Sequence, residues 1–292
     1  MKDPRGQSGF VLVLVLVVIA ICGAVLVASA RRCGQDAVLA TQVQQELQFR
    51  WGASSCRAAV LPVAEKLIEA QWRPKSPVVN QARVDIALGA MKFHLTVADE
   101  SAKANVNLLA RERDTAGFVA AIRRIRSGGR NVLSMELRPS KDAASEGQFD
   151  TRYANFEQLF SVDHPSEWIG GPQKDGAIEA RRLTFWGDGK VSLRRADLPV
   201  LREVLAGVVT ESQLADLDRF RRVKAKFSSA EAFAELELTQ EEVDALKPLA
   251  SEVSTCHSLW VTAEGMARSR YRLYVERSGE DPGPEPLVTL AW

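Results

Sequence analysis

The feature that most restricts how this chain can fold is an uncharged, apolar run from Phe10 to Ala30. It has 21 consecutive residues without a charge, and most of them are Val, Leu or Ile. In helical form, about 20 apolar residues cross the hydrocarbon core of a bilayer. The run therefore predicts a single membrane-spanning helix.

The same run also allows a secretory signal peptide, because Ala28-Ser29-Ala30 fits the small residues that precede a cleavage site. In that alternative, cleavage after Ala30 releases an exported soluble enzyme or binding protein. Two observations favour the anchor. The run is longer than the usual signal-peptide core of about 7–15 residues, and no helix-breaking proline follows it directly.

Beyond the apolar run, the sequence predicts an amphipathic helix that continues to about Trp72. Apolar residues recur at mixed spacings of three and four among Gln, Arg and Glu, which is typical of a helix with one buried face. Pro62 is expected to kink this helix at most, and the stretch 73–77 ends it with two prolines. The apolar positions are Val38, Val43, Leu47, Trp51, Ala58, Leu61, Leu67 and Ile68.

A short basic segment precedes the apolar run and ends in Gly9 before Phe10. This arrangement resembles the type IV prepilin class, in which a dedicated prepilin peptidase cuts after the glycine and methylates the new N-terminus. The resemblance implies a cut between Gly9 and Phe10 and N-methylation of Phe10. The fifth mature residue is then Leu14, where most of the class has Glu. The minor pseudopilin called general secretion pathway protein K typically lacks that Glu.

Charge and composition restrict the function classes. The chain has 292 residues, with 38 Lys and Arg against 37 Asp and Glu. Wholesale nucleic-acid binding needs a surplus of basic side chains on one face, so this balance argues against it. Lys2 and Arg5 favour a cytoplasmic N-terminus, although Arg31 and Arg32 reduce the charge asymmetry across the run.

The folded part after the helix, called the head here, has strand patterns at both of its ends. Residues 83–88 and 91–98 alternate apolar and polar side chains and predict a hairpin across Gly89-Ala90. Residues 259–264, 270–276 and 287–292 predict further strands. Helical patterns fill the middle, so the predicted fold class is α+β.

The helical middle contains a weak internal repeat. Asp99-Glu100-Ser101-Ala102-Lys103-Ala104-Asn105-Val106-Asn107 precedes a predicted helix at 114–126. A second copy around Gly187-Asp188-Gly189-Lys190 precedes a predicted helix at 197–206. In each copy a polar turn leads to Lys, then to a short alternating stretch, then to a helix.

Helix starts can also be read from capping residues. Asn155 and Ser228 or Ser229 are expected to accept from backbone N–H groups that a helix leaves unpaired. Thr239-Gln240-Glu241-Glu242 is a capping box that predicts a helix through Leu249.

Together these motifs and the terminal strands ending in Arg270-Tyr271-Arg272-Leu273 resemble the general secretion pathway protein K family over most of the chain. The residues that carry the resemblance are Asp99, Glu100, Lys103, Asn105 and Asn107 in the first copy and Asp188, Gly189 and Lys190 in the second. The family has a pilin-like fold with a long N-terminal helix, a small antiparallel sheet and a large inserted α-helical domain. Its members sit at the tip of the type II secretion pseudopilus.

The resemblance implies six segments: a leader at 1–9, an assembly helix at 10–31, its amphipathic continuation at 32–73, first strands at 74–98, an inserted domain of two similar units at 99–256, and last strands at 257–292. It further implies a single-pass protein of the bacterial inner membrane with its C-terminal head in the periplasm. The partners are then other minor pseudopilins, the inner-membrane secretion platform and the prepilin peptidase, with no nucleic acid.

A search for catalytic motifs indicates no enzyme. The histidines His94, His164 and His257 are far apart in sequence and form no helical zinc motif. No nucleophile elbow or phosphate-binding loop is present. Asp99 and Glu100 are assigned to a turn, Gly187–Lys190 to another turn, and His94 to the solvated face of a strand.

No cofactor is predicted, and calcium has only weak candidates. Glu280, Asp281 and Glu285 supply oxygen ligands of the kind that calcium prefers, in a Gly- and Pro-rich loop. Their spacing is not that of an EF-hand. Among the four cysteines, Cys56 with Cys256 is the one pairing worth testing, and free buried thiols are the simpler expectation.

Residues 198–222 offer a third function class, a membrane-tethered DNA-binding factor. Two short helices joined at Gly207 are similar to helix-hairpin-helix units that bind DNA backbones, and basic residues follow them: Arg219, Arg221, Arg222, Lys224 and Lys226. The near-zero net charge favours a packing role instead. The expected buried set is Leu201, Leu205, Leu214, Leu217 and Phe220.

Overall fold

The computed structural model describes residues 7–126, 153, 159, 181–224, 227–264, 271–277 and 288–291. The chain divides into two compact units, Met1–Trp51 and Gly52–Trp292. Each unit is described by itself below.

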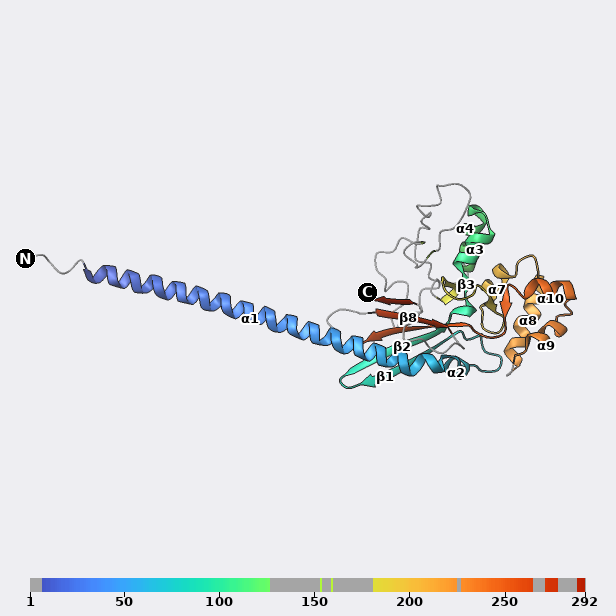
Figure 1. The fold of residues 1–292 in the computed structure, drawn as a ribbon, viewed down its shortest axis with the longest axis horizontal. Coiled ribbons are helices and arrows are strands. Elements are labelled where there is room, and N and C mark those ends of the chain that lie inside the picture. Colours follow the sequence, from blue (N-terminus) through green and yellow to red (C-terminus); the bar gives the residue numbers. More distant parts are fainter. Residues whose placement is uncertain are drawn as a thin grey trace, which may run out of the picture. The chain divides into compact units, whose positions relative to one another are not determined.

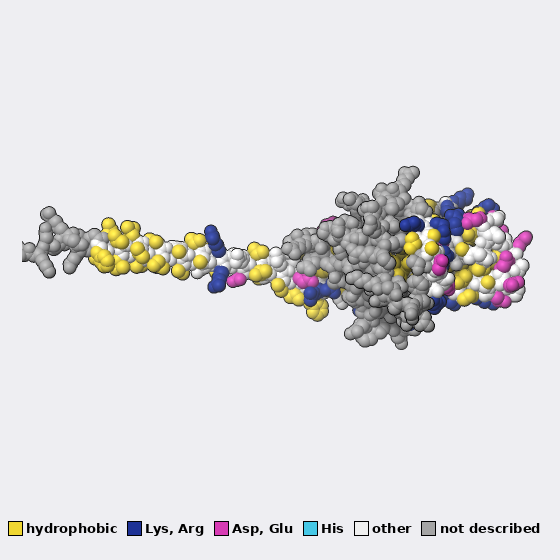
Figure 2. Space-filling view, turned by 90° about the horizontal axis from the view of Figure 1, so that it is seen from above, with side chains coloured by type: hydrophobic (Ala, Val, Ile, Leu, Met, Phe, Trp, Pro, Cys, Tyr) yellow, Lys and Arg dark blue, Asp and Glu magenta, His cyan; other side chains and the backbone are white. Residues whose placement is uncertain are grey.

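The first unit is helical. Helix α1 runs from Gln7 to Val60 and carries the whole apolar run (Figure 1). The large apolar side chains between Phe10 and Val27 are each about half exposed or more, and hydrophobic side chains cover the visible face of this stretch (Figure 2). Among the described residues, this is the one helix long and apolar enough to cross a membrane.

The helix does not continue unbroken to Trp72 as the sequence predicted. Helix α1 ends at Val60, a 3₁₀ turn (η2) spans Leu61–Val63, and α2 spans Ala64–Glu69. Pro62 lies inside that turn, where its missing N–H and its ring prevent the regular α-helical hydrogen bond. The proline therefore interrupts the helix, rather than merely bending it.

The second unit is built on a five-stranded antiparallel sheet of order β1-β2-β7-β8-β9 (Figure 1). The strands span Gln81–Leu88, Met91–Asp99, Cys256–Ala263, Tyr271–Arg277 and Val288–Ala291. Strands β1 and β2 form the predicted hairpin, in which Leu88 pairs with Met91 and Gly89 adopts a left-handed φ of 61°. The first and last strands of the head thus share one sheet, and the predicted α+β class with a small antiparallel sheet is confirmed.

The end of α1 and α2 cover one face of this sheet. Cys56, Ala64 and Ile68 are buried on the helical side, and alternate residues of β2 are buried on the sheet side. The closest approach is at Gly52, where a Cβ atom would lie 2.1 Å from Cζ of the buried Phe93. Glycine is therefore required at this position for the helix to pack on the strand.

The described part of the region between β2 and β7 is mainly helical and contains two pairs of very short strands. Its elements are η3 (Glu100–Ala102), β3 (Ala104–Asn105), α3 (Val106–Glu112), α4 (Thr115–Arg126), β4 (Leu183–Thr184), β5 (Val191–Ser192), α7 (Leu198–Val204), α8 (Glu211–Val223), α9 (Ser229–Glu235), α10 (Gln240–Leu246) and β6 (Ala250–Ser251). We call residues 100–255 the inserted region. Strand β3 pairs with β4 and β5 with β6, both in parallel.

The two predicted copies of the repeat each contain one of these short strands followed by helices. Strand β3 leads into α3 and α4, and β5 leads into α7 and α8. One apolar core joins the helices that follow both strands. The predicted buried set of α7 and α8 lies in this core: Leu201, Leu205, Leu214 and Leu217 are buried, and Phe220 packs against them half-buried.

Helix starts in the inserted region follow the capping residues in most cases. Thr239 and Glu242 form the predicted capping box of α10, and Thr210 with Gln213 forms another at α8. The predicted capping bond from a serine side chain at the start of α9 was wrong. Ser228 is the N-cap residue but its side chain makes no capping bond. The carboxylate of Glu252 instead accepts from the backbone N–H and the hydroxyl of Ser229. Asn155 lies outside the described residues.

Candidate functional site: an apolar helix and a buried network around Arg195

The first candidate site is the N-terminal part of α1. Gly9 lies in its first turns, Phe10 is 72% exposed and Leu14 is 54% exposed. No acidic residue precedes Asp36 along this helix after its start at Gln7. The helix therefore presents an apolar surface without a carboxylate to anything that packs against its membrane-spanning length.

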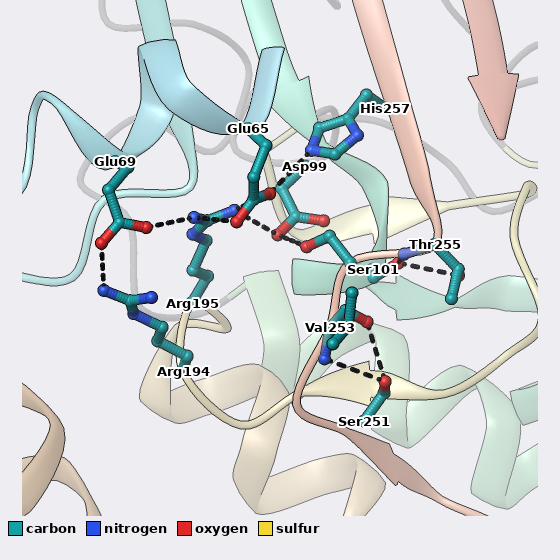
Figure 3. A network of polar contacts seen from close by, with 11 residues as sticks. Glu65, Glu69, Asp99, Ser101, Arg194, Arg195, Ser251, Val253, Thr255 and His257 are labelled. Carbon is teal, nitrogen blue, oxygen red and sulfur yellow. Dashed lines mark hydrogen bonds and ion pairs between the residues drawn. The ribbon is translucent and has the colours of Figure 1, made fainter. Parts of the chain in front are cut away.

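The second candidate site is a polar network around Arg195, which follows strand β5 (Figure 3). Its guanidinium donates to both carboxylate oxygens of Glu65 at 2.6 Å and to Glu69 at 3.1 Å. The same guanidinium lies 3.5 Å from the carboxylate of Asp99. The Arg195 side chain is only 6% exposed, so one buried cation joins α2 to the end of β2.

The spacing of the two glutamates explains how α2 holds two adjacent arginines. Glu65 and Glu69 are four residues apart and therefore lie on the same face of the helix. Glu69 also accepts from the neighbouring Arg194, so the pair of carboxylates meets the pair of guanidiniums (Figure 3). Paired charges of this kind hold α2 against the segment between β5 and α7.

Asp99 is the most deeply buried acid of this network. It is fully buried, and one oxygen accepts from the hydroxyl of Ser254. Its other oxygen, Oδ1, has no hydrogen-bond partner among the described residues. Burial raises the pKa of Asp99 above its usual range.

Glu65 shows the opposite shift. His257 Nε2 lies 3.3 Å from Glu65 Oε2, and this histidine, followed by Arg195, lowers the pKa of Glu65 to about 2. Hydrogen bonds and nearby positive charge stabilise the ionised carboxylate. The two acids of one network thus differ in their surroundings, since Glu65 is about half exposed and Asp99 is not.

A second buried ion pair follows directly along the chain. Lys103 Nζ lies 2.5 Å from Glu100 Oε1, and the hydroxyl of Ser258 also donates to that oxygen. The side chains of Glu100 and Lys103 are 0% and 2% exposed. The sequence assigned Asp99 and Glu100 only to a turn. A 3₁₀ turn is present at Glu100–Ala102, but both carboxylates also serve as buried partners for residues distant in sequence.

The two asparagines of the same motif connect strands to loops. Asn105 caps α3 by accepting from Leu108 N at 3.1 Å and donates to Trp186 O at 3.1 Å. Asn107 accepts from Tyr153 N at 2.7 Å and donates to Tyr153 O at 3.0 Å. Amides suit these positions because each supplies both a donor and an acceptor.

The second motif forms the predicted turn. Asp188 Oδ1 accepts from Lys190 N at 3.0 Å. Gly187 and Gly189 have φ angles of 92° and 84°, in the left-handed region that favours glycine. Among the described residues, the side chains of Asp188 and Lys190 take no part in the ion pairs around Asp99 and Arg195.

The prediction of a merely solvated His94 was wrong. Its Nδ1 lies 2.8 Å from Asp85 Oδ1, and its Nε2 lies 2.7 Å from Glu264 Oε1. These carboxylates, Asp85 first, raise the pKa of His94. The imidazole therefore bridges β1 to the end of β7 through two charge-assisted hydrogen bonds.

The other predicted site residues are either separate or outside the described residues. Cys56 and Cys256 are both buried free thiols, and burial raises the pKa of each. Outside the described residues lie His164, Lys226 and the calcium candidates Glu280, Asp281 and Glu285. In the part of the chain that the structure describes, no group of three or more His, Cys, Asp or Glu side chains could hold a metal ion.

The basic residues around α8 divide between the interior and the surface of the fold. The Arg221 side chain is 1% exposed, and it donates to Asp218 and to the backbone carbonyls of Leu193 and Ala196. Arg219 and Lys224 pair with Asp216 and Glu231. A DNA backbone needs basic groups free at the surface, and the buried Arg221 instead binds carbonyls within the fold, which favours the packing role for this residue.

Sequence reasoning missed six members of the network: Glu65, Glu69, Arg194, Arg195, Ser254 and His257. Two weak signals precede them in the sequence, namely the four-residue spacing of Glu65 and Glu69 and the adjacent Arg194-Arg195. Neither signal indicates that these segments meet. What the network does chemically is to hold charges in fixed pairs between elements.

The described residues thus define a protein with one candidate membrane helix and an α+β head built on a five-stranded antiparallel sheet. No protein-family model matches the sequence, and no curated protein matches it. Among solved structures, the chain is similar to a chain in the crystal structure of the GspK-GspI-GspJ complex from the type 2 secretion system of enterotoxigenic Escherichia coli. That match has a TM-score of 0.45 and 15% sequence identity, and it covers 86% of this chain and 99% of that chain. A likeness of this extent does not assign a function, which therefore has to rest on the residues of this chain.

Proposed function

We propose that this chain is a minor pseudopilin of a type II secretion system, similar to general secretion pathway protein K. In this role it is a non-enzymatic subunit that is inserted in the bacterial inner membrane with its head in the periplasm. It assists pseudopilus initiation and protein secretion across the outer membrane.

The observation that carries the proposal is the start of α1. The Gly9–Phe10 junction has the residue pair that a prepilin peptidase recognises, and a continuous exposed apolar surface follows it within the same helix. After cleavage this surface begins at the new N-terminus. A helix of this kind can leave the lipid and pack among similar helices, because the partner surfaces are equally apolar.

Leu14 supports a place at the tip. A filament subunit with Glu at this position offers a carboxylate to the N-terminal amine of the neighbouring subunit above it. Leu14 cannot do so, and a tip subunit has no subunit above it. The large inserted region favours the same position, because its bulk would obstruct stacking along a filament.

Mass spectrometry of the mature N-terminus tests the processing step. The full chain is produced in a bacterium with a prepilin peptidase and in a matched strain without it. We expect an N-methylated chain that begins at Phe10 in the first strain only, and Gly9→Leu should abolish it. A chain that begins at Arg31, and that disappears with Ala30→Leu, would identify the signal-peptide alternative and refute the proposal.

Partner and position need separate measurements. Cysteine cross-linking in the membrane should join this chain to other minor pseudopilins and to the inner-membrane secretion platform. Gold labelling of the head on purified pseudopili should place it at one end of each filament. Label distributed along the filament would contradict the tip position while leaving the pseudopilin assignment intact.

A further inference from the structure

Strand β1 is an open edge of the five-stranded sheet (Figure 1). Within the described residues, its backbone pairs with β2 and with no other strand. Residues Arg83, Asp85 and Ala87 are exposed, and Leu88 is 38% exposed. The second half of β1 therefore presents one side of a strand to solvent.

The direction of the outward backbone groups follows from the pairing of β2. Backbone groups along an antiparallel strand point alternately to its two sides. Lys92 O accepts from Glu264 N at 2.9 Å, so the backbone of Lys92 is directed to the β7 side of β2. Ala87 lies opposite Lys92. Its backbone groups therefore also point away from the interface between β1 and β2.

The same alternation applies along the rest of β1. Asp85 and Arg83 follow Ala87 in steps of two and also point outward, so each of these three residues offers one N–H and one C=O. Val84 and Ile86 alternate with them and direct their backbone groups to β2. The outward side of β1 is thus a regular row of donors and acceptors without a strand partner among the described residues.

This edge lacks several of the features that protect free edges from further pairing. Such edges are commonly interrupted by proline, lysine or a β-bulge. The sequence of β1 contains neither Pro nor Lys. Its pairing with β2 is unbroken from Gln81 opposite Ala98 to Leu88 opposite Met91, so it contains no bulge. The edge is therefore regular enough to accept one more strand.

The side chains of the outward residues carry opposite charges. Arg83 and Asp85 lie two residues apart and therefore on the same face of the sheet. Asp85 contacts His94 and Lys92 but remains 56% exposed, and a carboxylate can accept further bonds. Directly opposite residues on neighbouring strands stabilise the pair when their charges differ. An incoming strand is thus favoured if it places an acid opposite Arg83 and a base opposite Asp85.

We propose that β1 accepts an extended segment of another protein as an additional antiparallel strand. From its N-terminus, this segment carries a basic, an apolar and an acidic residue in turn, opposite Asp85, Val84 and Arg83. The antiparallel direction continues the order of the sheet and gives the more stable pairing. Backbone hydrogen bonds supply the affinity, and the order of the charges supplies the specificity.

A second copy of this chain has the same order of charges in its own β1, where Arg83 precedes Asp85. The two-fold axis of such a pair is perpendicular to the sheet, so the ends of α1, which lie on the sheet, would run in opposite directions. Chains anchored in one membrane by this helix cannot pair in that way. The choice of another protein thus rests on the membrane anchor of the proposed function, whereas the strand addition uses only the second unit.

Solvent exchange of backbone amides, measured by nuclear magnetic resonance on the full chain in detergent micelles, tests the strand addition. The probes are acetyl-Thr-Val-Lys-Val-Glu-amide and the charge-exchanged acetyl-Thr-Val-Glu-Val-Lys-amide. We expect the first peptide to bind with a Kd on the order of 1 mM. Near saturation it should slow exchange of the Arg83, Asp85 and Ala87 amides about fivefold. The Val84 and Ile86 amides should not change, since they already bond to β2. The second peptide should bind more weakly by about threefold or more.

Two variants with matched controls make the result specific. Ala87→Pro removes an outward N–H but no bond to β2, so it should weaken binding about fivefold or more, whereas Ala87→Ser should bind normally. Arg83→Glu should abolish the preference between the two peptides, because each then has one favourable and one unfavourable charge pair. Arg111→Glu changes an exposed arginine of α3 and should leave the preference intact. Unchanged amide resonances of β7 and β8 show that each variant is folded.

Four results would overturn the proposal: no slowing of exchange with the first peptide, equal slowing at Val84 and Arg83, equal or reversed affinities of the two peptides, or normal binding by Ala87→Pro. Protection of the outward amides without peptide, lost on dilution, would also overturn it, because a second copy would then occupy the edge. Each of these outcomes is independent of cleavage after Gly9, so failure here and failure of the proposed function are distinguishable.

Discussion

Replacement of Arg195 by Gln should destabilise the second unit more than any comparable loss of a single surface charge. The change leaves Asp99 fully buried, with Ser254 as its hydrogen-bond partner and His257 nearby. Loss of one partner of a buried ion pair costs about 3–5 kcal/mol. The Glu65 and Glu69 contacts add little, because these carboxylates are about half exposed and water screens them. We therefore expect a loss of about 3 kcal/mol.

Arg194→Gln is the matched control. It removes the same charge from the adjacent residue, but the Glu69 carboxylate that Arg194 contacts is about half exposed. We expect a cost of about 1 kcal/mol or less. For a unit of this size, each kcal/mol lowers Tm by about 2–4 °C. Arg195→Gln should thus lower Tm by about 6–12 °C, and Arg194→Gln by no more than about 4 °C.

The assay is thermal unfolding of the full chain in detergent, followed by near-ultraviolet circular dichroism. Equal shifts for the two variants would refute the reasoning, because they would show that burial of Asp99 contributes nothing. The pH dependence gives a second check. Asp99 has a raised pKa, so the folded state binds more protons than the unfolded state, whose Asp titrates near about 3.9. The deficit of Arg195→Gln should therefore shrink as the pH falls from 8 to 5.

Three further changes test other parts of the fold by the same thermal assay. His94→Gln should cost about 0.5–1 kcal/mol at pH 5.5 and less at pH 8.5. The reason is that the raised pKa of His94, due mainly to Asp85, gives stability that is present below about pH 6.5 and lost as the pH rises through the folded-state pKa; an equal cost at both values would contradict it. Thr239→Ala should cost about 1 kcal/mol through loss of the capping box, and a neutral result would show that α10 does not depend on its cap. Gly52→Ala should cost about 1–3 kcal/mol because its Cβ would overlap the buried ring of Phe93, whereas a gain in Tm would show that the ring moves freely.

The elements were largely predictable from local patterns. The alternation of Phe93, Leu95 and Val97 predicted β2, and the capping box at Thr239 predicted α10, because each pattern reports on its own few residues. The effect of Pro62 on the helix was underestimated, since the sequence predicted a kink and the helix ends there. A proline inside a helix permits either a kink or a stop, and the choice depends on how the following residues pack.

The Arg195 network could not be predicted in the same way. Its members come from α2, β2, the segment after β5, and β7. Within a short stretch of sequence, each of these charged residues is indistinguishable from one that lies at the surface. Burial of Asp99 depends on which strands become neighbours, and that is a property of the whole sheet. Local sequence carries the hydrogen-bonding capacity of these side chains but not their distances.

The pairing of β2 with β7 also determines the order in which the head can fold. Asp99 at the end of β2 pairs with His257 at the start of β7, and the whole inserted region lies between them. Pairs so distant in sequence form slowly, since the conformational entropy of closing the loop is lost before any contact between the strands contributes favourable free energy. A prefolded inserted region shortens that loop, because its two ends then lie beside each other. Until β7 arrives, β2 keeps an open edge with unpaired backbone groups. A chain arrested during synthesis before residue 256 is therefore expected to aggregate through β2, which makes rapid folding of the inserted region a protection for the sheet.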